Sequence, residues 1–141
     1  MFREFQINRI YQGGLDKGAD ILEGLFGVMK QHRISAGIIS GIGAVTEARL
    51  AYYNAETRAY EEKAFPEPLE IVSLKGNISI KDDAVFPHLH AVLSRSDFTA
   101  VGGHLLPRTY VFAFEFEIIP FVGEPFVREF DEATGLFLWK K

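Results

Sequence analysis

Helical spacing occurs in one stretch of this chain only, and this restricts the fold more than any other feature. Between Ile21 and Met29, apolar residues recur three or four positions apart, and basic residues follow at 30–33. Basic side chains near a helix end suit the helix dipole. The pattern therefore predicts one helix over 18–32, with Asp16 as its N-cap.

The rest of the chain has the composition and patterning of β-strands. It contains 13 Phe residues and many Val and Ile, which favour strands and an aromatic core. In the clearest strand, 110–119 (YVFAFEFEII), Phe112 should share a face with the next two phenylalanines. A first strand should end at Gly13-Gly14. We expect strands at 2–11, 36–45, 46–53, 58–65, 69–80, 87–94, 100–106 and 110–119, and a short hairpin at 126–139.

These elements together predict an α+β fold, in which one main helix packs on a strongly bent, mostly antiparallel β-sheet. A bulge is expected at Gly76-Asn77. The 141 residues suit one domain of common size, without repeats, linkers or low-complexity stretches. We therefore expect a single domain over 1–141.

Composition excludes several kinds of site. The chain has no Cys, so disulfides, thiolate metal sites and cysteine nucleophiles are excluded. The first ten residues carry charges unlike a signal peptide, and no run approaches the roughly 18 apolar residues that span a membrane. We expect a cytoplasmic protein without a membrane partner. The net charge is −4 and the basic residues are scattered, so we expect no specific binding to duplex DNA by this chain alone.

Three of the four histidines lie within one short segment, at His88, His90 and His104. Alternate residues of a strand share a face, so the first two imidazoles should point the same way. A turn around Ser96-Asp97 can return the chain, so that His104 lies opposite the pair. Gly102-Gly103 permits a bulge that would re-aim the third imidazole. Three imidazoles with an open fourth position predict a divalent metal site, and zinc is the expected ion.

The plainer alternative is that these histidines are ordinary polar residues of strands. His32 lies near the predicted helix end, where a cation is favourable, and we interpret it as structural. Glu70 and Glu115 are the candidate catalytic carboxylates, as a general base or as partners that orient a histidine. The alternative for Glu115 and Glu117 is a solvated face. Glu70 could instead be a buried side chain that needs a partner.

Several motifs in a fixed order resemble a known family. Gly41-Ile42-Gly43-Ala44-Val45, the segment LEIVSLKGNIS (69–79), the His-x-His pair and Gly-Gly-His-Leu at 102–105 are similar to the plant and prokaryote conserved (PPC) domain. The resemblance extends over about residues 2–125. It implies a mixed α/β fold with one helix on an antiparallel sheet, and a homotrimer.

The resemblance also divides the functional alternatives. Plant members of the family join this domain to AT-hook DNA-binding motifs, whereas stand-alone prokaryotic members carry the histidines and are often labelled DNA-binding. This chain has the histidines and no Arg-Gly-Arg-Pro hook. The leading hypothesis is a trimeric, zinc-binding PPC-domain protein of unassigned reaction. The alternatives are a metal-dependent enzyme on a small molecule, and a DNA-binding or regulatory protein. Arg95 and Arg108 could form a basic spot for a small anionic ligand.

Overall fold

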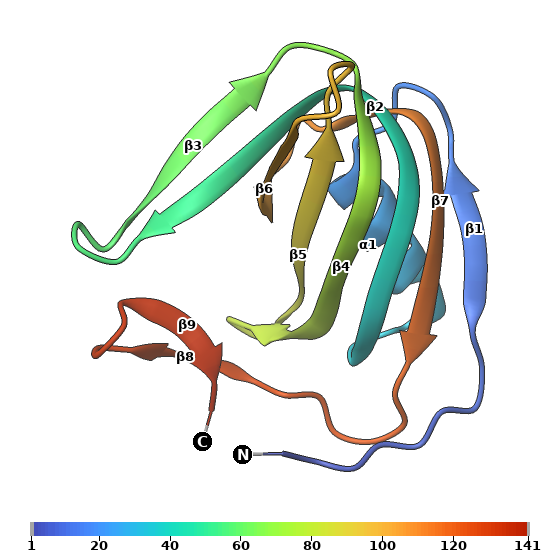
Figure 1. The fold of residues 1–141 in the computed structure, drawn as a ribbon. Helices are drawn as coiled ribbons and strands as arrows, with labels where there is room; N and C mark the ends of the chain where they lie inside the picture. The colour runs from blue at the N-terminus through green and yellow to red at the C-terminus, as the bar shows by residue number, and fades with distance from the viewer. Residues whose placement is uncertain (1, 141) are drawn as a thin grey trace.

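The fold is that of a computed structural model, which describes residues 2–140 (Figure 1). A first group of elements builds the bent sheet, and a final hairpin lies beside it. In chain order they are β1 (Tyr11–Leu15), α1 (Ile21–His32), β2 (Gly37–Asn54), β3 (Ala59–Phe65), β4 (Leu69–Lys81), β5 (Ala84–Ser94), β6 (Ala100–Leu105), β7 (Tyr110–Pro120), β8 (Arg128–Asp131) and β9 (Leu136–Trp139).

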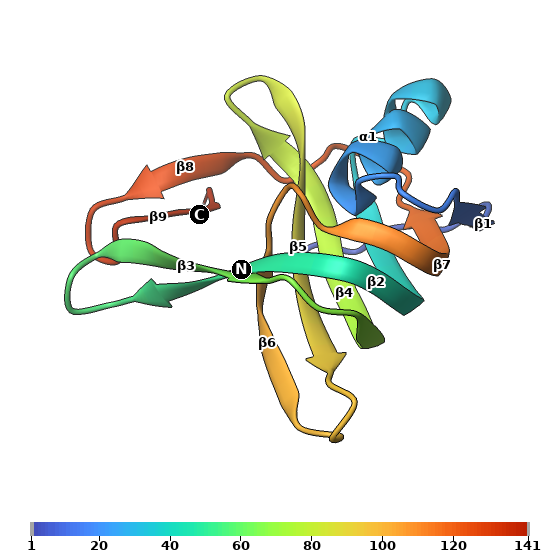
Figure 2. The same cartoon turned by 90° about the horizontal axis from the view of Figure 1, so that it is seen from above.

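Seven strands form one sheet in which every pairing is antiparallel. The order is β1-β7-β2-β4-β5-β6, with β3 on the outer half of β2. Strands β8 and β9 pair only with each other as a second, two-stranded sheet. Figure 2 shows α1 on one side of the large sheet, while β3 and the β8–β9 hairpin project from the other end. The sheet thus has a covered face and a more open end.

The predicted α+β class is wrong, because the protein is mostly antiparallel β-sheet. Strands account for 60% of the chain and helix for 9%. Helix α1 has only 12 residues, and its buried face consists of Ile21, Leu25 and Met29. The other buried apolar residues come chiefly from the sheet, including Val45, Leu74 and others of one core cluster. One short helix is thus a minor part of a core that strand residues dominate.

The N-cap of helix α1 is Asp20, four residues after the predicted cap Asp16, and the helix begins at Ile21 instead of residue 18. The Asp20 carboxylate accepts hydrogen bonds from Glu23 N and from the backbone N of Arg108, so it joins the helix start to the loop before β7. A tertiary contact therefore selects between two carboxylates that could each cap a helix. Within residues 2–140, no helix is long and apolar enough to cross a membrane.

The predicted bounds of the first strand are wrong, because Gly13-Gly14 lies inside β1 and does not end it. The two glycines pair with β7, in register with Phe116 and Glu115. A Cβ on Gly13 would lie 3.1 Å from the Phe116 ring, and one on Gly14 would lie 3.0 Å from a β7 carbonyl oxygen. The pair therefore permits a close approach of two strands here, and does not break the strand.

The two strands predicted at 36–45 and 46–53 are one strand, β2, of 18 residues. Its first part pairs with β7 and β4 in the middle of the sheet, and its last part pairs with β3. The predicted β2–β3 hairpin is confirmed. In Figure 1 this hairpin forms an arm that leaves the body of the sheet and leans over the concave side. One long strand thus connects the core to a wall of the site described below.

Irregular strand pairing makes two predictions wrong, namely the face on which Phe112 lies and the position of the bulge in β4. The β2–β7 register shifts next to Phe112, which is 54% exposed, whereas Val111 is fully buried. Phe112 therefore does not share the buried face of Phe114 and Phe116. The bulge expected at Gly76-Asn77 is absent from the β4–β5 ladder, whose register shifts between Ile71 and Ser73 instead. The alternation of apolar and polar residues cannot locate a bulge by itself. The extra residue of a bulge reverses the face on which each later side chain of the strand lies.

Candidate metal centre

The β5–β6 hairpin brings the three histidines together, as their spacing predicts. His88 and His90 lie on β5, and His104 on β6 pairs directly with His90. On the other side of β5, β4 places Asn77 opposite His88 and Lys75 opposite His90. Regular pairing on both sides of β5 therefore holds the histidine pair, and the register of β6 brings the third ring across from it.

The Gly102-Gly103 pair has a different role from the predicted one. The β5–β6 ladder runs through both glycines without a shift in register, so no bulge re-aims His104. Strand β6 also meets β2, where Ala51 pairs with His104. A Cβ on Gly103 would lie 2.5 Å from the carbonyl oxygen of Ala51. The glycine is required because β6 packs closely against a second strand.

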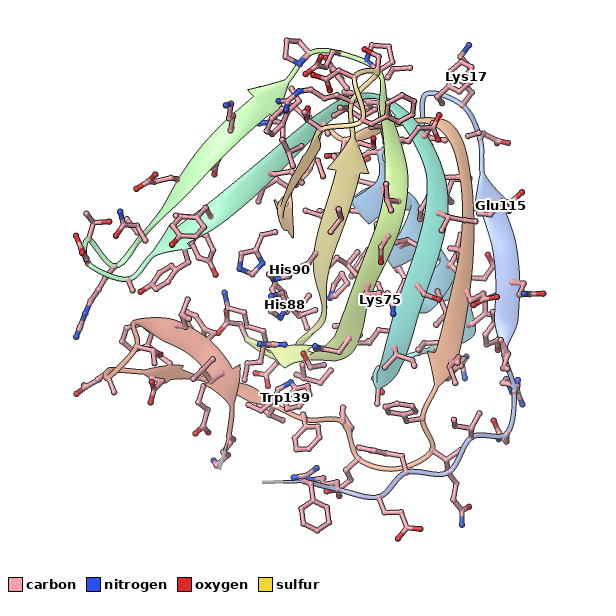
Figure 3. All side chains as sticks on the ribbon, viewed as in Figure 1. Lys17, Lys75, His88, His90, Glu115 and Trp139 are labelled. Atoms are coloured by element: carbon pink, nitrogen blue, oxygen red, sulfur yellow. The ribbon has the colours of Figure 1, made fainter. Side chains whose placement is uncertain are left out.

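Three ring nitrogens converge on one point. His88 Nε2 lies 3.1 Å from His104 Nδ1 and 3.2 Å from His90 Nε2. All three lie within 4.8 Å of one another. Tetrahedral zinc with Zn–N bonds of about 2.0–2.1 Å separates its nitrogen ligands by about 3.3–3.4 Å. Figure 3 shows His88 and His90 projecting into the concave space that the β2–β3 arm overhangs. The two separations from His88 Nε2 are therefore close to those of a tetrahedral zinc site.

The surroundings favour neutral rings, which is the form that binds metals. The pKa of His88 is lowered to about 4, chiefly by burial, with smaller contributions from the positive charge of Arg128 and from the other two rings. Burial also lowers the pKa of His90 and is the largest cause of the lowered pKa of His104. All three rings are therefore uncharged near neutral pH.

One contact of His88 departs from the usual pattern of metal sites. A ligand histidine normally donates a hydrogen bond from its second nitrogen to an acceptor. His88 Nδ1 instead lies 3.3 Å from Nη2 of Arg128, which can only donate. In the neutral ring the proton is then on Nε2. A metal that binds Nε2 would require this proton to move to Nδ1 and the contact with Arg128 to break. The guanidinium also adds positive charge beside the site.

A cavity of about 640 Å³ opens directly beside the histidines. His88 and His104 line it on one side, together with Tyr60, whose ring meets the His104 ring edge-on at 5.0 Å. Arg128 and Lys81 are the cations of its lining. Much of the remaining wall is apolar. A space of this size is typical of sites for small organic molecules.

The candidate carboxylates lie elsewhere. Glu70 is exposed on β4 and pairs with Ser94, so it is not the buried side chain considered from the sequence. Glu115 and Glu117 are exposed and line a second hollow of about 540 Å³ on the open face of the sheet. There, Gln12 donates to Glu117 at 2.8 Å. None of these carboxylates lines the cavity beside the histidines, as the position of Glu115 in Figure 3 illustrates.

The cations of the cavity were not found from the sequence. Arg95 forms an ion pair with Glu67 at 2.9 Å, and neither Arg95 nor Arg108 lines the cavity. Arg128 and Lys81 occupy that place instead. No local pattern marks Arg128, because it follows the three histidines by at least 24 positions and reaches them only through the fold of the C-terminal hairpin. Its unusually low exposure, 8%, is a property of the structure alone.

Comparison with known families bears out the resemblance of the motifs. The sequence profile of the Plants and Prokaryotes Conserved domain, the PPC domain, matches residues 2–122. The chain belongs to this family. The matched region contains all three histidines and ends before the β8–β9 hairpin. Arg128 therefore lies outside the part of the chain that the profile describes.

Solved structures agree with this PPC assignment. A metal-containing protein from Archaeoglobus fulgidus is 40% identical, with a TM-score of 0.95, and the match covers 100% of this chain and 99% of that one. A PPC protein from Pyrococcus horikoshii is 29% identical, with a TM-score of 0.93 and 100% and 97% coverage. A candidate DNA-binding protein from Bacteroides thetaiotaomicron is 33% identical, with a TM-score of 0.85 and 96% coverage of both chains. No curated protein matches the chain.

Proposed function

We propose that this PPC-domain protein binds one divalent metal ion, with zinc as the expected ion, through His88 Nε2, His90 Nε2 and His104 Nδ1. The convergence of these nitrogens at 3.1 and 3.2 Å carries the proposal. A 40% identical relative described as metal-containing supports it. Three neutral imidazoles suit zinc, and the fourth position of the ion would remain open toward a ligand.

Metal content of single variants tests the site. Protein purified without an affinity tag should contain about one zinc per chain by elemental analysis. His88→Ala, His90→Ala and His104→Ala should each lose the metal, because two imidazoles alone bind zinc far more weakly. His32→Ala is the matched control, since His32 is exposed at the end of α1 and its ring contacts only Tyr11 among the aromatic pairs of the described chain.

Two results would contradict the metal site. Full metal retention in any one of the three variants would remove that residue from it. Equal metal loss in His32→Ala would show that the assay measures a general effect of histidine removal and not this cluster.

A second candidate function is a metal-dependent reaction on a small molecule, and the adjoining cavity favours it. A bound zinc ion would polarise a ligand oxygen or lower the pKa of a bound water. Tyr60 is a hydroxyl-bearing neighbour on the cavity wall. Turnover of nitrophenyl esters that requires zinc and is lost in His90→Ala would support catalysis. Equal turnover by the metal-free protein would contradict it.

We also infer that the protein forms a homotrimer and does not bind duplex DNA specifically by itself. The trimer rests on the family resemblance, and light scattering that shows a stable monomer would exclude it. The expectation for DNA rests on the net charge of −4 and on the ion pair that neutralises Arg95. Micromolar binding in a mobility-shift assay at about 100 mM salt would contradict it.

A further inference from the structure

The cavity beside the histidines holds two cations that have no acidic partner within residues 2–140. Neither Arg128 nor Lys81 forms an ion pair there, and Glu62, the acidic side chain of the wall, is paired with Arg49 at 2.8 Å. Arg128 is only 8% exposed. Buried charges in proteins are normally paired, because removing a charge from water is costly. No acidic side chain of residues 2–140 therefore offsets the charge of these two cations.

The Arg128 guanidinium is fixed in place by neutral acceptors. Its Nε donates to Ser79 Oγ at 2.8 Å, Nη2 donates to Asn77 Oδ1 at 2.9 Å, and Nη1 donates to the Phe137 carbonyl oxygen at 3.0 Å. These bonds orient the group without neutralising it. A rigid and uncompensated guanidinium is a prepared site for an anion, because little side-chain entropy is lost when the anion binds.

Lys81 brings a second positive charge to the same wall. Its Nζ lies 4.0 Å from the centre of the Phe137 ring and 5.5 Å from that of Phe86. The Arg128 guanidinium carbon lies 5.3 Å from the same Phe86 ring. Both cations thus adjoin one aromatic side chain of the cavity. An anion near Phe86 would interact with both of them at short range.

The remaining wall indicates what the anion is attached to. It is mostly apolar, and its side chains come from β4–β6 on one side and from the β8–β9 hairpin on the other. A fully hydrated inorganic anion gains nothing from such a surface, whereas a molecule with an apolar body does. The apolar wall includes Phe86, Leu89, Leu105, Leu136, Phe137 and Leu138.

We propose that this cavity binds a small organic carboxylate, with its anionic end beside Arg128 and Lys81 and its apolar body against the Phe86 and β8–β9 side of the wall. The proposal deepens the proposed metal-binding function and rests on it in one respect: an ion held by three neutral imidazoles would add to the positive charge that faces the carboxylate. The two protein cations and the apolar wall do not depend on the metal.

Calorimetric titration of the zinc-loaded protein with hexanoate tests the proposal. Acetate is the control without an apolar body, and hexanol is the control without a charge. Lys81→Gln should weaken hexanoate binding roughly tenfold, the usual effect of losing one charge-assisted contact, and Lys81→Arg should restore it. Lys17→Gln is the matched control, because Lys17 also lies over an aromatic ring, Phe112 at 4.8 Å, but on the far side of the molecule (Figure 3).

The outcomes separate the carboxylate site from the metal site. Equal affinity for hexanoate and acetate, or unchanged hexanoate affinity in Lys81→Gln, would overturn the carboxylate proposal while the zinc content still supports the metal site. If the wild-type protein binds no zinc, the metal proposal fails, and the same titrations on that protein still decide the carboxylate proposal. Tenfold weakening in Lys81→Gln alone would then support it, and equal weakening in Lys17→Gln would overturn it.

Discussion

Two hairpins supply opposite walls of the candidate site, and the fold holds them in very different ways. The β5–β6 hairpin is part of the large sheet, with β4 paired along one side and β2 meeting β6 on the other. The β8–β9 hairpin is a separate two-stranded sheet. A hairpin of this kind is at best marginally stable alone, so its position depends on contacts with the rest of the protein.

The contacts with the rest of the protein lie at both ends of the hairpin. At its base, Arg128 reaches Ser79 and Asn77 of β4, and Trp139 stacks on Phe126 with ring centres 4.4 Å apart. At its tip, the Tyr53 hydroxyl donates to the Thr134 carbonyl oxygen at 2.7 Å. The hairpin therefore bridges β4 and the β2–β3 arm across the cavity.

Because the two hairpins are held differently, the geometry of the histidines and the lining of the cavity should depend on different parts of the fold. Strand pairing sets the backbone positions of the three histidines, so their convergence should not depend on the C-terminal hairpin, although the His88 ring contacts Arg128 of that hairpin. The charge and the apolar lining of the cavity do depend on it, because Arg128, Leu136 and Phe137 come from this hairpin. Metal binding and ligand choice should therefore respond to different substitutions.

The largest expected effect concerns how the β8–β9 hairpin is held. Arg128→Ala removes three side-chain hydrogen bonds of a charged donor and leaves buried Ser79 with fewer partners. We expect the opening free energy of the hairpin to fall by about 3 kcal/mol. Hydrogen bonds of a charged donor contribute roughly 1.5–3 kcal/mol each, and the removal of a buried, unpaired charge offsets part of their loss. Hydrogen exchange of the Gly135 and Lys140 amides, which are hydrogen-bonded within this region, measures it.

Exchange in the β5–β6 ladder should be unchanged in the same variant. Faster exchange of the His90 and His104 amides, or loss of zinc, would show that the two hairpins are one cooperative unit and that the proposed separation is incorrect.

The next effect concerns the β5–β6 hairpin itself. Gly103→Ala places a Cβ 2.5 Å from the Ala51 carbonyl oxygen, so β6 must move away from β2. We expect a loss of about 1–3 kcal/mol in the free energy of unfolding, together with weaker zinc binding, because His104 is the adjacent residue. Urea denaturation and elemental analysis measure the two effects.

Gly27→Ala is the matched control for this substitution. Gly27 lies in α1, and a Cβ there meets nothing within 4 Å. Alanine in a helix is favoured over glycine by about 1 kcal/mol, so this variant should be slightly more stable. Stabilisation by Gly103→Ala as well would contradict the close approach of β6 and β2.

Acid should lower the free energy of unfolding of the metal-free protein through His88 on β5. The pKa of His88 is about 4 in the folded protein, against 6.5 for an ordinary histidine. Between these values the unfolded chain binds a proton that the folded chain does not. The free energy of unfolding should therefore be highest above pH 6.5 and should fall as the pH drops toward 4.

Urea denaturation in the presence of a chelator measures this dependence. His88→Gln should flatten the profile between pH 6.5 and 4, whereas His32→Gln should keep it. The same slope in His88→Gln as in the wild type would assign the acid sensitivity to other groups.

The smallest effect should come from the ion pair between Lys140 and Glu129 in the β8–β9 region. Its atoms are 2.6 Å apart, but the side chains are 62% and 52% exposed. Exposed pairs contribute little, because water and salt screen them, so Lys140→Ala should change stability by less than about 1 kcal/mol. A change as large as that of Arg128→Ala would mean that surface charge, and not the buried guanidinium, holds the hairpin.

Features that depend on residues close together in the chain were predicted correctly from the sequence. The His-x-His pair, the turn after β5 and the partner position of His104 follow from the two-residue period of strands and from turn residues. The β2–β3 and β8–β9 hairpins were predicted for the same reason. The fold class was not, because helical spacing shows that a helix exists but does not show how little of the core it supplies.

Other features depend on which segments meet. Asp16 and Asp20 are equally suited to cap a helix, and the choice is made by the Arg108 backbone amide, which is far away in sequence. The Gly13-Gly14 and Gly102-Gly103 pairs look like breaks or bulges, yet both allow neighbouring strands to approach closely.

The sequence alone thus determined that the three histidines converge, since three histidines on one hairpin need only local periodicity to do so. The tertiary structure decided what surrounds them. Arg128 and Lys81 come to the histidines from β8 and from the end of β4, and the cavity between them exists only because a separate hairpin docks across the sheet. A contact between segments distant in sequence produces no periodic pattern in either segment. For that physical reason the cationic side of the site could be seen only in the folded chain.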